Sequence, residues 1–379
     1  MPAAQGPSLG SLFPFIASQA VKGEYPLSFL QPRFNDIVSW RAEMRAKIMA
    51  LLNYAPPKCP HNAETVEKID CGDFIREKIY FNTTPDIRVP AFVLVPKKAN
   101  GRSPAPAIVA LHDHGGYYLW GKEKIVSTEP MHDGLKKWRD GYGGKSIADE
   151  LARQGYVVIV IDMFYWGERR MILDGDAADW RDRPLSLTAE RIQEFNHRSG
   201  SNEQLVGRTI LSAGFTWPGV IIHDDIRTVD YLVTRPEVDP NRIGAVGLSV
   251  GGLRTCYLTA LDERIRAGVV VGWMASFRRQ LETHMPHSIG FTKLIPGLYH
   301  DLDYPDMAAL AAPRALLVIN GNKDALFELN GVKECFSKLE QIYAKAGAPE
   351  KFKGSLYDAP HEFNLAMQEE AWSWLKRFV

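Results

Sequence analysis

Ser249 stands between glycines at a point where the predicted structure changes from strand to helix. Gly247, Ser249 and Gly251 form a Gly-x-Ser-x-Gly sequence. Residues 242–246 predict a short buried strand, and residues 253–261 predict a helix. In this setting only glycines fit beside the serine, and the tight turn lifts its hydroxyl clear of the backbone. The pattern indicates a nucleophilic serine; the alternative is a glycine-rich turn without chemistry.

A serine hydroxyl is a weak nucleophile at neutral pH, so it needs a base and a carboxylate that orients the base. In strand–turn–helix sites of this kind the chain order is serine, acid, histidine. Asp324 closes a turn after the apolar run 315–319, with Glu328 as the alternative acid, and His361 follows the last predicted strand. We therefore expect Asp324 to hold His361 as the base for Ser249. The alternatives are a turn residue at Asp324 and a surface histidine at His361.

The oxyanion of acyl transfer needs two N–H donors. The backbone N–H of Val250 is the first candidate, because it follows the nucleophile at the start of a helix. The loop after the predicted strand 107–111 is glycine-rich and supplies the second, for which we favour His114 or Gly115. The spacing of His112 and His114 could instead suggest zinc. Glycines stand where the further ligands would follow, so we expect no metal.

Length, charge and cysteine usage narrow the class of protein. The 379 residues allow one large or two ordinary domains, and 45 acidic and 45 basic side chains give a formal net charge of zero. A balanced charge argues against nucleic acid or an anionic membrane as the main partner. No apolar run has the length of a membrane span. The poor match of the N-terminus to a secretion signal and four scattered cysteines predict a cytoplasmic protein. The partner that we expect is a small-molecule substrate of the serine site.

Apolar strands alternate with amphipathic helices along most of the chain, which predicts an α/β protein with a mostly parallel, doubly wound sheet. Residues 36–54 have the apolar spacing of a helix. We expect an N-terminal helical extension over residues 1–65 and a catalytic domain over 66–379. Within the extension, residues 1–35 form either an arm of a homo-oligomer or a flexible tail, and their proline and glycine content favours neither over the other. The connections 162–218 and 273–312 are too long for plain turns, so we expect them to roof the serine.

Several motifs together resemble those of the α/β-hydrolase superfamily. More narrowly, residues 70–379 resemble the bacterial acetyl-xylan-esterase-like and dienelactone-hydrolase-like serine esterases. The resemblance rests on the Gly-x-Ser-x-Gly turn and on Leu111–Gly116, Asp162–Arg169, Asp225–Arg242, Asp303–Asp306, Ala312–Arg314, Asp324 and His361. It implies the α/β-hydrolase fold, a triad of Ser249, Asp324 and His361, no cofactor, and hydrolysis of small carboxylic esters, often acetyl groups on sugars.

The expected function is therefore that of a carboxylesterase that forms an acyl-enzyme on small, short-acyl esters. Two alternatives remain from the sequence. One is an amidase or peptidase that uses the same three residues. The other is a catalytically silent binding protein on this fold, although none of the three side chains is lost.

Overall fold

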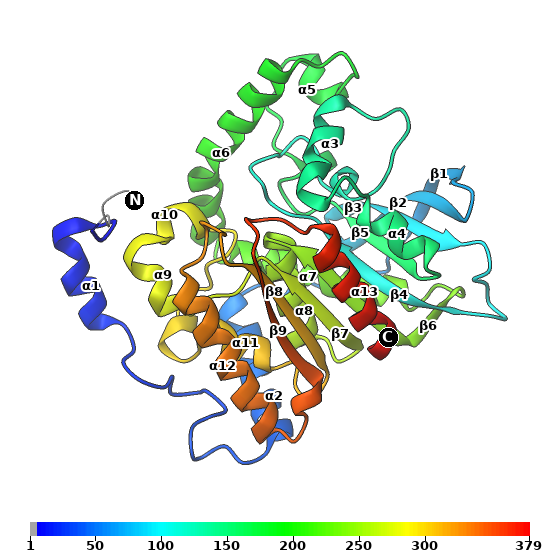
Figure 1. Cartoon of the computed structure of the whole chain (residues 1–379). Coiled ribbons are helices and arrows are strands. Elements are labelled where there is room, and N and C mark those ends of the chain that lie inside the picture. The colour runs from blue at the N-terminus through cyan, green and yellow to red at the C-terminus, as the bar shows by residue number, and fades with distance from the viewer. Residues whose placement is uncertain (1–5) are drawn as a thin grey trace.

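Within residues 6–379, which the computed structural model describes, nine strands form one sheet (Figure 1). Their order is β1-β2-β3-β5-β4-β6-β7-β8-β9. β1, β2, β3 and β5 pair antiparallel, and every pair from β5 to β9 is parallel. The strands are β1 (Glu64–Asp70), β2 (Phe74–Thr84), β3 (Ile87–Pro96), β4 (Ala105–Leu111), β5 (Val157–Ile161), β6 (Val238–Leu248), β7 (Ile265–Val271), β8 (Ala315–Gly321) and β9 (Phe352–Tyr357).

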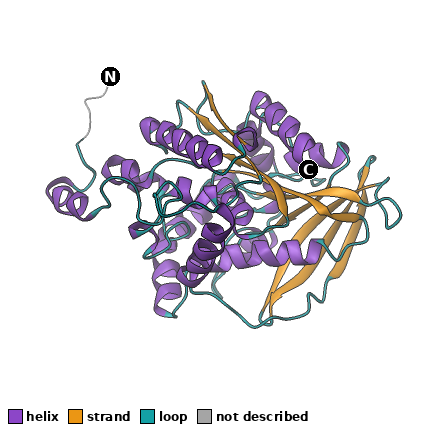
Figure 2. Ribbon diagram, turned by 90° about the horizontal axis from the view of Figure 1, so that it is seen from below, coloured by secondary structure: helices purple, strands orange, loops and turns teal. Residues whose placement is uncertain are grey.

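Helices cover both faces of this sheet (Figure 2). One face packs on α4 (Ile147–Arg153) and α13 (Leu365–Phe378). The other packs on α2 (Ile37–Leu52), α7 (Trp217–Leu232), α8 (Val250–Leu261), α11 (Tyr304–Ala309) and α12 (Leu329–Lys345). The remaining α-helices are α1 (Phe13–Gln19), α3 (Asp133–Trp138), α5 (Ala178–Asp182), α6 (Ala189–Ser212), α9 (Phe277–Thr283) and α10 (Met285–Ser288). The predicted fold class is confirmed.

The parallel strands end together at one edge. Leu111 at the end of β4 pairs with Gly247 of β6, and Gly321 at the end of β8 pairs with Tyr357 of β9. The loops that follow these strands therefore begin side by side. This is where parallel α/β sheets bind their ligands.

The long helix α6 stands above that edge and away from the sheet (Figure 1). The Thr188 side chain accepts a hydrogen bond from the Arg191 backbone and caps its start. Ile192 and Phe195 of α6 pack with Trp166 and Trp217 in an aromatic-rich cluster. The region 162–218, which showed little periodicity in the sequence, therefore contains a 24-residue helix.

The predicted helix over 36–54 is α2, and it belongs to the main core. Trp40, Met44, Ile48 and Leu52 of α2 are buried in the cluster formed by α8, α11 and α12. α1, in contrast, has no buried residue and lies at the margin of the molecule (Figure 1). The extension expected over residues 1–65 thus contributes its second helix to the body of the protein.

Within residues 6–379, no single helix is both long and apolar enough to span a membrane. α6 and α7 together have the length and apolar composition of a span, with a bend of 83° between them.

Candidate active site

Ser249 occupies the sharp turn between β6 and α8. Its φ of 60° and ψ of −123° are unusual for a residue with a side chain. The turn is locked because the Ser249 N–H donates to the Val271 carbonyl at 2.8 Å. A Cβ at Gly251 would lie 2.0 Å from the Leu111 carbonyl oxygen, so only glycine allows this approach of α8 to β4. The local geometry is that of a nucleophile elbow.

His361 and Asp324 meet across two loops. His361 Nδ1 lies 2.6 Å from Asp324 Oδ2. Asp324 is buried, and its Oδ1 accepts the Leu326 N–H at 3.0 Å, which fixes the carboxylate. Glu328, the alternative acid, instead caps α12 by accepting the N–H groups of Asn330 and Gly331. Of the two candidate acids, the structure brings only Asp324 to His361.

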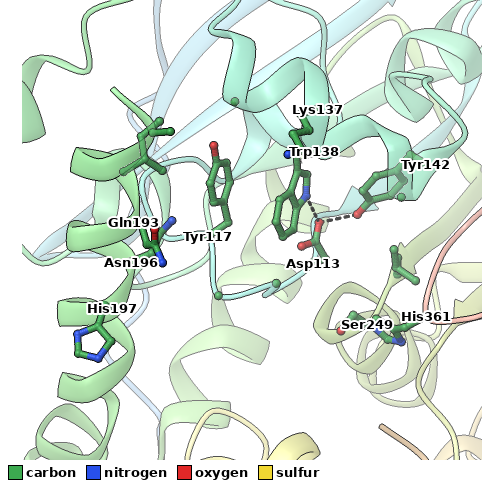
Figure 3. Close-up of a pocket in the computed structure, with 17 residues that line it drawn as sticks. Asp113, Tyr117, Lys137, Trp138, Tyr142, Gln193, Asn196, His197, Ser249 and His361 are labelled. Carbon is green, nitrogen blue, oxygen red and sulfur yellow. Dashed lines mark hydrogen bonds between the residues drawn. The ribbon is translucent and has the colours of Figure 1, made fainter. Parts of the chain in front are cut away.

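Ser249 and His361 face the same cavity (Figure 3). The His361 ring packs over Gly272, where a Cβ would lie 3.1 Å from Cε1. Since Asp324 engages Nδ1, Nε2 is the ring nitrogen left for the serine. Within residues 6–379 no hydrogen bond joins the Ser249 hydroxyl to the imidazole. Such contacts are often loose without substrate and tighten when it binds.

Two of the three predicted oxyanion donors adjoin the serine in the chain or share its cavity, whereas His114 is not among the lining residues that the structure describes. Val250 is the first residue of α8, and Gly115 lines the cavity with a φ of +55°. Among the described residues no acceptor contacts the backbone N–H of Val250 or of Gly115. The Gly116 N–H is already occupied, because it donates to His114 Nδ1 at 2.9 Å.

The ring nitrogens of His112 and His114 are engaged by protein groups. His112 Nε2 accepts the Met163 N–H at 3.0 Å, and Nδ1 lies 2.8 Å from the Asp113 carbonyl. His114 Nε2 lies 2.7 Å from Glu203 Oε1. Burial lowers the pKa of both histidines, that of His112 strongly. This pair is therefore built into the loop by hydrogen bonds and does not present free metal ligands.

A second group with metal-ligating atoms lies behind the loop. Carboxylates of Glu123, Asp162 and Glu168 approach within 4.8 Å of one another. The buried ammonium of Lys122 lies among them, at 3.3, 2.8 and 2.5 Å. Burial lowers the pKa of Lys122, but these three carboxylates reverse the shift and hold it above its usual value. The lysine thus supplies the positive charge that this cluster needs.

The cavity has a volume of about 900 Å³. One wall consists of Tyr117 and Trp138, whose rings stack at 4.7 Å. Beside Tyr117, α6 contributes Ile192, Gln193, Asn196 and His197 to the lining (Figure 3). Part of the connection 162–218, on α6, therefore lines the cavity. In the described part of the chain, residues 273–312 contribute no lining residue; Ile295 and Leu298 pack into the core beside α2 instead.

Asp113 organises the wall and was not singled out in the sequence. Its Oδ1 accepts the Tyr142 hydroxyl at 2.6 Å and the Trp138 indole N–H at 3.4 Å (Figure 3). Burial raises the pKa of Asp113, but Lys124 and the Tyr142 hydroxyl more than offset this, so the net shift is downward. The only sequence signal was its place in the glycine-rich loop. The contact with Tyr142 joins distant segments and has no sequence signature.

Comparison with known proteins places the chain in a family. Residues 16–373 match the model of the Abhydrolase family. The chain belongs to this family. It is accordingly an enzyme of the hydrolase type, and the match includes most of residues 1–65, for which the sequence offered no counterpart.

Individual relatives agree with this assignment. The Bacillus subtilis (strain 168) protein "Putative hydrolase YtaP" is 28% identical over 339 residues, which cover 89% of this chain and all of that protein. A "putative acetyl xylan esterase" of Bacteroides fragilis NCTC 9343 has a TM-score of 0.71 at 19% identity, over 92% of this chain and 82% of the other. A glucuronoyl esterase from Solibacter usitatus has a TM-score of 0.60 at 15% identity, over 95% and 98%. The solved structures share the α/β-hydrolase fold of this Abhydrolase family member.

Proposed function

We propose that this Abhydrolase family member is a serine carboxylic ester hydrolase that acts through an acyl-enzyme. The observation that carries the proposal is the 2.6 Å contact between His361 and Asp324 at the cavity that contains Ser249. A nucleophile at a strained turn, an imidazole and an orienting carboxylate are the parts that acyl transfer requires.

In the first half of the reaction, His361 Nε2 takes the proton of the Ser249 hydroxyl as Oγ attacks the ester carbonyl carbon. The carbonyl electron pair moves to oxygen, and the N–H groups of Val250 and Gly115 stabilise the resulting oxyanion. When the carbonyl re-forms, the bond to the alcohol oxygen breaks and His361 protonates that oxygen. The products of this half are a free alcohol and an ester of Ser249.

In the second half, water replaces the alcohol. His361 takes a proton from the water, and the oxygen attacks the acyl carbon through a second oxyanion. Collapse of that intermediate releases the carboxylic acid and returns the proton to Ser249. Asp324 keeps His361 in one orientation throughout and stabilises the imidazolium each time it forms.

The dimensions of the cavity favour a short acyl group on a larger alcohol. A volume of about 900 Å³ is far more than an acetyl group fills, so most of the space serves the alcohol part. The aromatic rings of Tyr117 and Trp138 and the side-chain amides of Gln193 and Asn196 line this space, and together they suit a sugar ring, which has apolar faces and a polar rim. The acetyl xylan and glucuronoyl esterases among its structural relatives support carbohydrate esters as the class to test first.

The first test compares Ser249→Ala with the unchanged protein on p-nitrophenyl acetate. We expect kcat to fall at least about 10⁴-fold, because the nucleophile is lost. Ser212→Ala, which changes an exposed serine at the end of α6, is the matched control and should keep full activity. Equal turnover by Ser249→Ala and the unchanged protein would exclude Ser249 as the nucleophile.

A second set of measurements distinguishes a serine esterase from the two alternative functions, an amidase or peptidase and a catalytically silent binding protein. A fluorophosphonate probe should label Ser249 in the folded protein, as located by peptide mass spectrometry, and Ser249→Ala should remain unlabelled. A folded but unlabelled protein would favour a catalytically silent scaffold. Acetylated xylo-oligosaccharides and a short peptide panel, assayed together, distinguish ester from amide hydrolysis.

A further inference from the structure

The loop of residues 112–116, which follows β4 and faces Ser249, is held from behind by a buried ammonium. Lys124 ends a 3₁₀ turn over Lys122–Lys124 and is completely buried. Its Nζ donates to the backbone carbonyl of Asp113 at 2.9 Å and to that of His114 at 3.0 Å. These contacts tie down two consecutive peptide units of the loop.

The second of these peptide units contains the N–H of Gly115. The His114 carbonyl also accepts the Trp166 indole N–H at 3.2 Å and the Tyr117 backbone N–H at 3.3 Å, so three donors fix its direction. In a planar trans peptide the C=O and N–H bonds point in opposite directions. The N–H of Gly115 therefore points away from Lys124. Gly115 itself lines the cavity that contains Ser249.

The charge of Lys124 has a second effect on the same loop. The Asp113 carboxylate lies against Gly115, where a Cβ would be 2.6 Å from Oδ2. A carboxylate so close would repel a developing oxyanion. Lys124 Nζ lies 3.5 Å from this Oδ2 and offsets its charge.

We propose that Lys124 is a positioning residue of the oxyanion hole: by holding the Asp113 and His114 carbonyls it aims the Gly115 N–H at the carbonyl oxygen of the substrate. This inference rests on the proposed ester hydrolysis at Ser249 and adds a residue that does not touch the substrate. A hydrogen bond from a cation to the carbonyl also polarises the peptide and makes its N–H a stronger donor.

The test substitutes Lys124→Met and separates binding from catalysis. An aimed N–H acts on the oxyanion and hardly on the ground state, so kcat should fall about 10²-fold while KM changes less than about twofold. The affinity for phenylboronic acid, which forms a tetrahedral adduct with a serine, should fall in proportion to kcat. A lysine with a merely structural role would lower the amount of folded enzyme and leave kcat per labelled Ser249 unchanged.

Lys122→Met is the matched control. Lys122 lies in the same turn and is equally buried, but its ammonium bonds to Glu123, Asp162 and Glu168 and not to the loop. We expect it to lower stability and to keep kcat per folded molecule within about twofold. An equal loss of kcat in both variants would show a general structural effect and overturn the proposal.

Two further variants keep the proposal open to refutation. Trp166→Phe removes the second side-chain donor to the His114 carbonyl and leaves only the Tyr117 backbone N–H beside Lys124, so it should lower kcat roughly threefold to tenfold; it decides the question if Lys124→Met does not fold. Lys124→Met with Asp113→Asn removes both charges. Full recovery of kcat in this double variant would mean that Lys124 acts only by neutralising the charge of Asp113. The proposal that Lys124 orients the Gly115 N–H would then be wrong.

The outcomes also distinguish this inference from the proposed function. If fluorophosphonate does not label the unchanged protein, ester hydrolysis at Ser249 fails. If the unchanged protein is labelled and active, and Lys124→Met or Trp166→Phe has the same kcat, ester hydrolysis stands and the role of Lys124 is overturned.

Discussion

At the scale of single residues, the backbone of Ser249 stores strain. Its positive φ of 60° lies where side-chain-bearing residues are rare, and such conformations cost about 1–3 kcal/mol. The Ser249 N–H bond to β7 and the glycine contacts with β4 hold the turn in place. The site therefore gains an exposed hydroxyl at the expense of stability.

Ser249→Gly should relieve this strain, whereas Ser249→Ala should keep it. We expect the glycine variant to be more stable than the alanine variant by about 1 kcal/mol, measured as the free energy of unfolding in urea. The pair Ser212→Gly and Ser212→Ala at the end of α6 is the control, and there glycine should be the less stable. If Ser249→Gly were less stable than Ser249→Ala, the backbone of residue 249 would not be strained.

Lys293 gives the stability a dependence on pH. Burial lowers its pKa from 10.5 to about 8, although Glu203 opposes the shift. Below about pH 8 the lysine is charged in both the folded and the unfolded chain, and the folded state bears the desolvation cost. Between pH 8 and 10.5 the folded state has released its proton and the unfolded state still holds it. The free energy of unfolding therefore rises with pH across this window.

Lys293→Met should accordingly be more stable than the unchanged protein at pH 7, by roughly 1–3 kcal/mol. The difference should shrink as the pH rises from 8 to 10.5, as measured by urea unfolding at several pH values. Lys333→Met, at an exposed lysine of α12, should show no such trend. A constant difference for Lys293→Met would contradict the shifted pKa.

Three site residues could be named from the sequence because each follows a recognisable strand. Ser249, Asp324 and His361 come after apolar runs in a fixed chain order, and parallel strands end at a common edge. Asp113, Tyr142 and Lys124 could not be assigned, because their contacts join loops whose relative positions depend on the whole fold. No local pattern encodes such contacts.

At the scale of elements, α6 decides how much room the alcohol part of the substrate has. Gln193 lines the cavity and is exposed, so a larger side chain there can enter the space without disturbing the core. Gln193→Trp should lower kcat/KM for acetylated xylo-oligosaccharides roughly 10-fold and leave p-nitrophenyl acetate within about twofold. Both are measured by initial rates.

Glu194→Trp is the control on the same helix. Glu194 is exposed and is not among the residues that line the cavity. We expect it to leave both substrates unaffected. An equal loss on both substrates in Gln193→Trp would mean that the change acts on catalysis, and α6 would not be the wall of the alcohol site.

The sequence predicted the inner elements well and missed several peripheral ones, among them β1 and α6. Buried strands such as β5 and β8 are continuous apolar runs, which is why they could be recognised. β1 is an edge strand with mostly exposed residues, so it lacks an apolar face. α6 buries few side chains along its length and contains two glycines, which obscured its periodicity.

At the scale of the whole molecule, α2 ties the N-terminal region to the core. Met44 is fully buried among helices of the main domain, whereas Met49 of the same helix is 39% exposed. Met44→Ala should lower the free energy of unfolding by roughly 2–5 kcal/mol, and Met49→Ala by less than about 0.5 kcal/mol. Denaturant unfolding with activity as a second signal would test this. Equal effects would mean that α2 is not part of the cooperative unit.

The boundary expected after residue 65 could not have been placed correctly from the sequence. It falls inside β1, and the contacts that join α2 to α8 and α12 span most of the chain. Amphipathic spacing shows that a helix has an apolar face. It does not show which surface that face covers.

The order of the strands has a consequence for the folding of this enzyme. The hydroxyl, the carboxylate and the imidazole follow β6, β8 and β9, and β7 separates the first strand from the other two. The three groups can therefore meet only when β6, β7, β8 and β9 lie side by side. Regain of turnover after denaturation would report that this end of the sheet has formed, so the enzyme can serve as its own reporter of that step in folding.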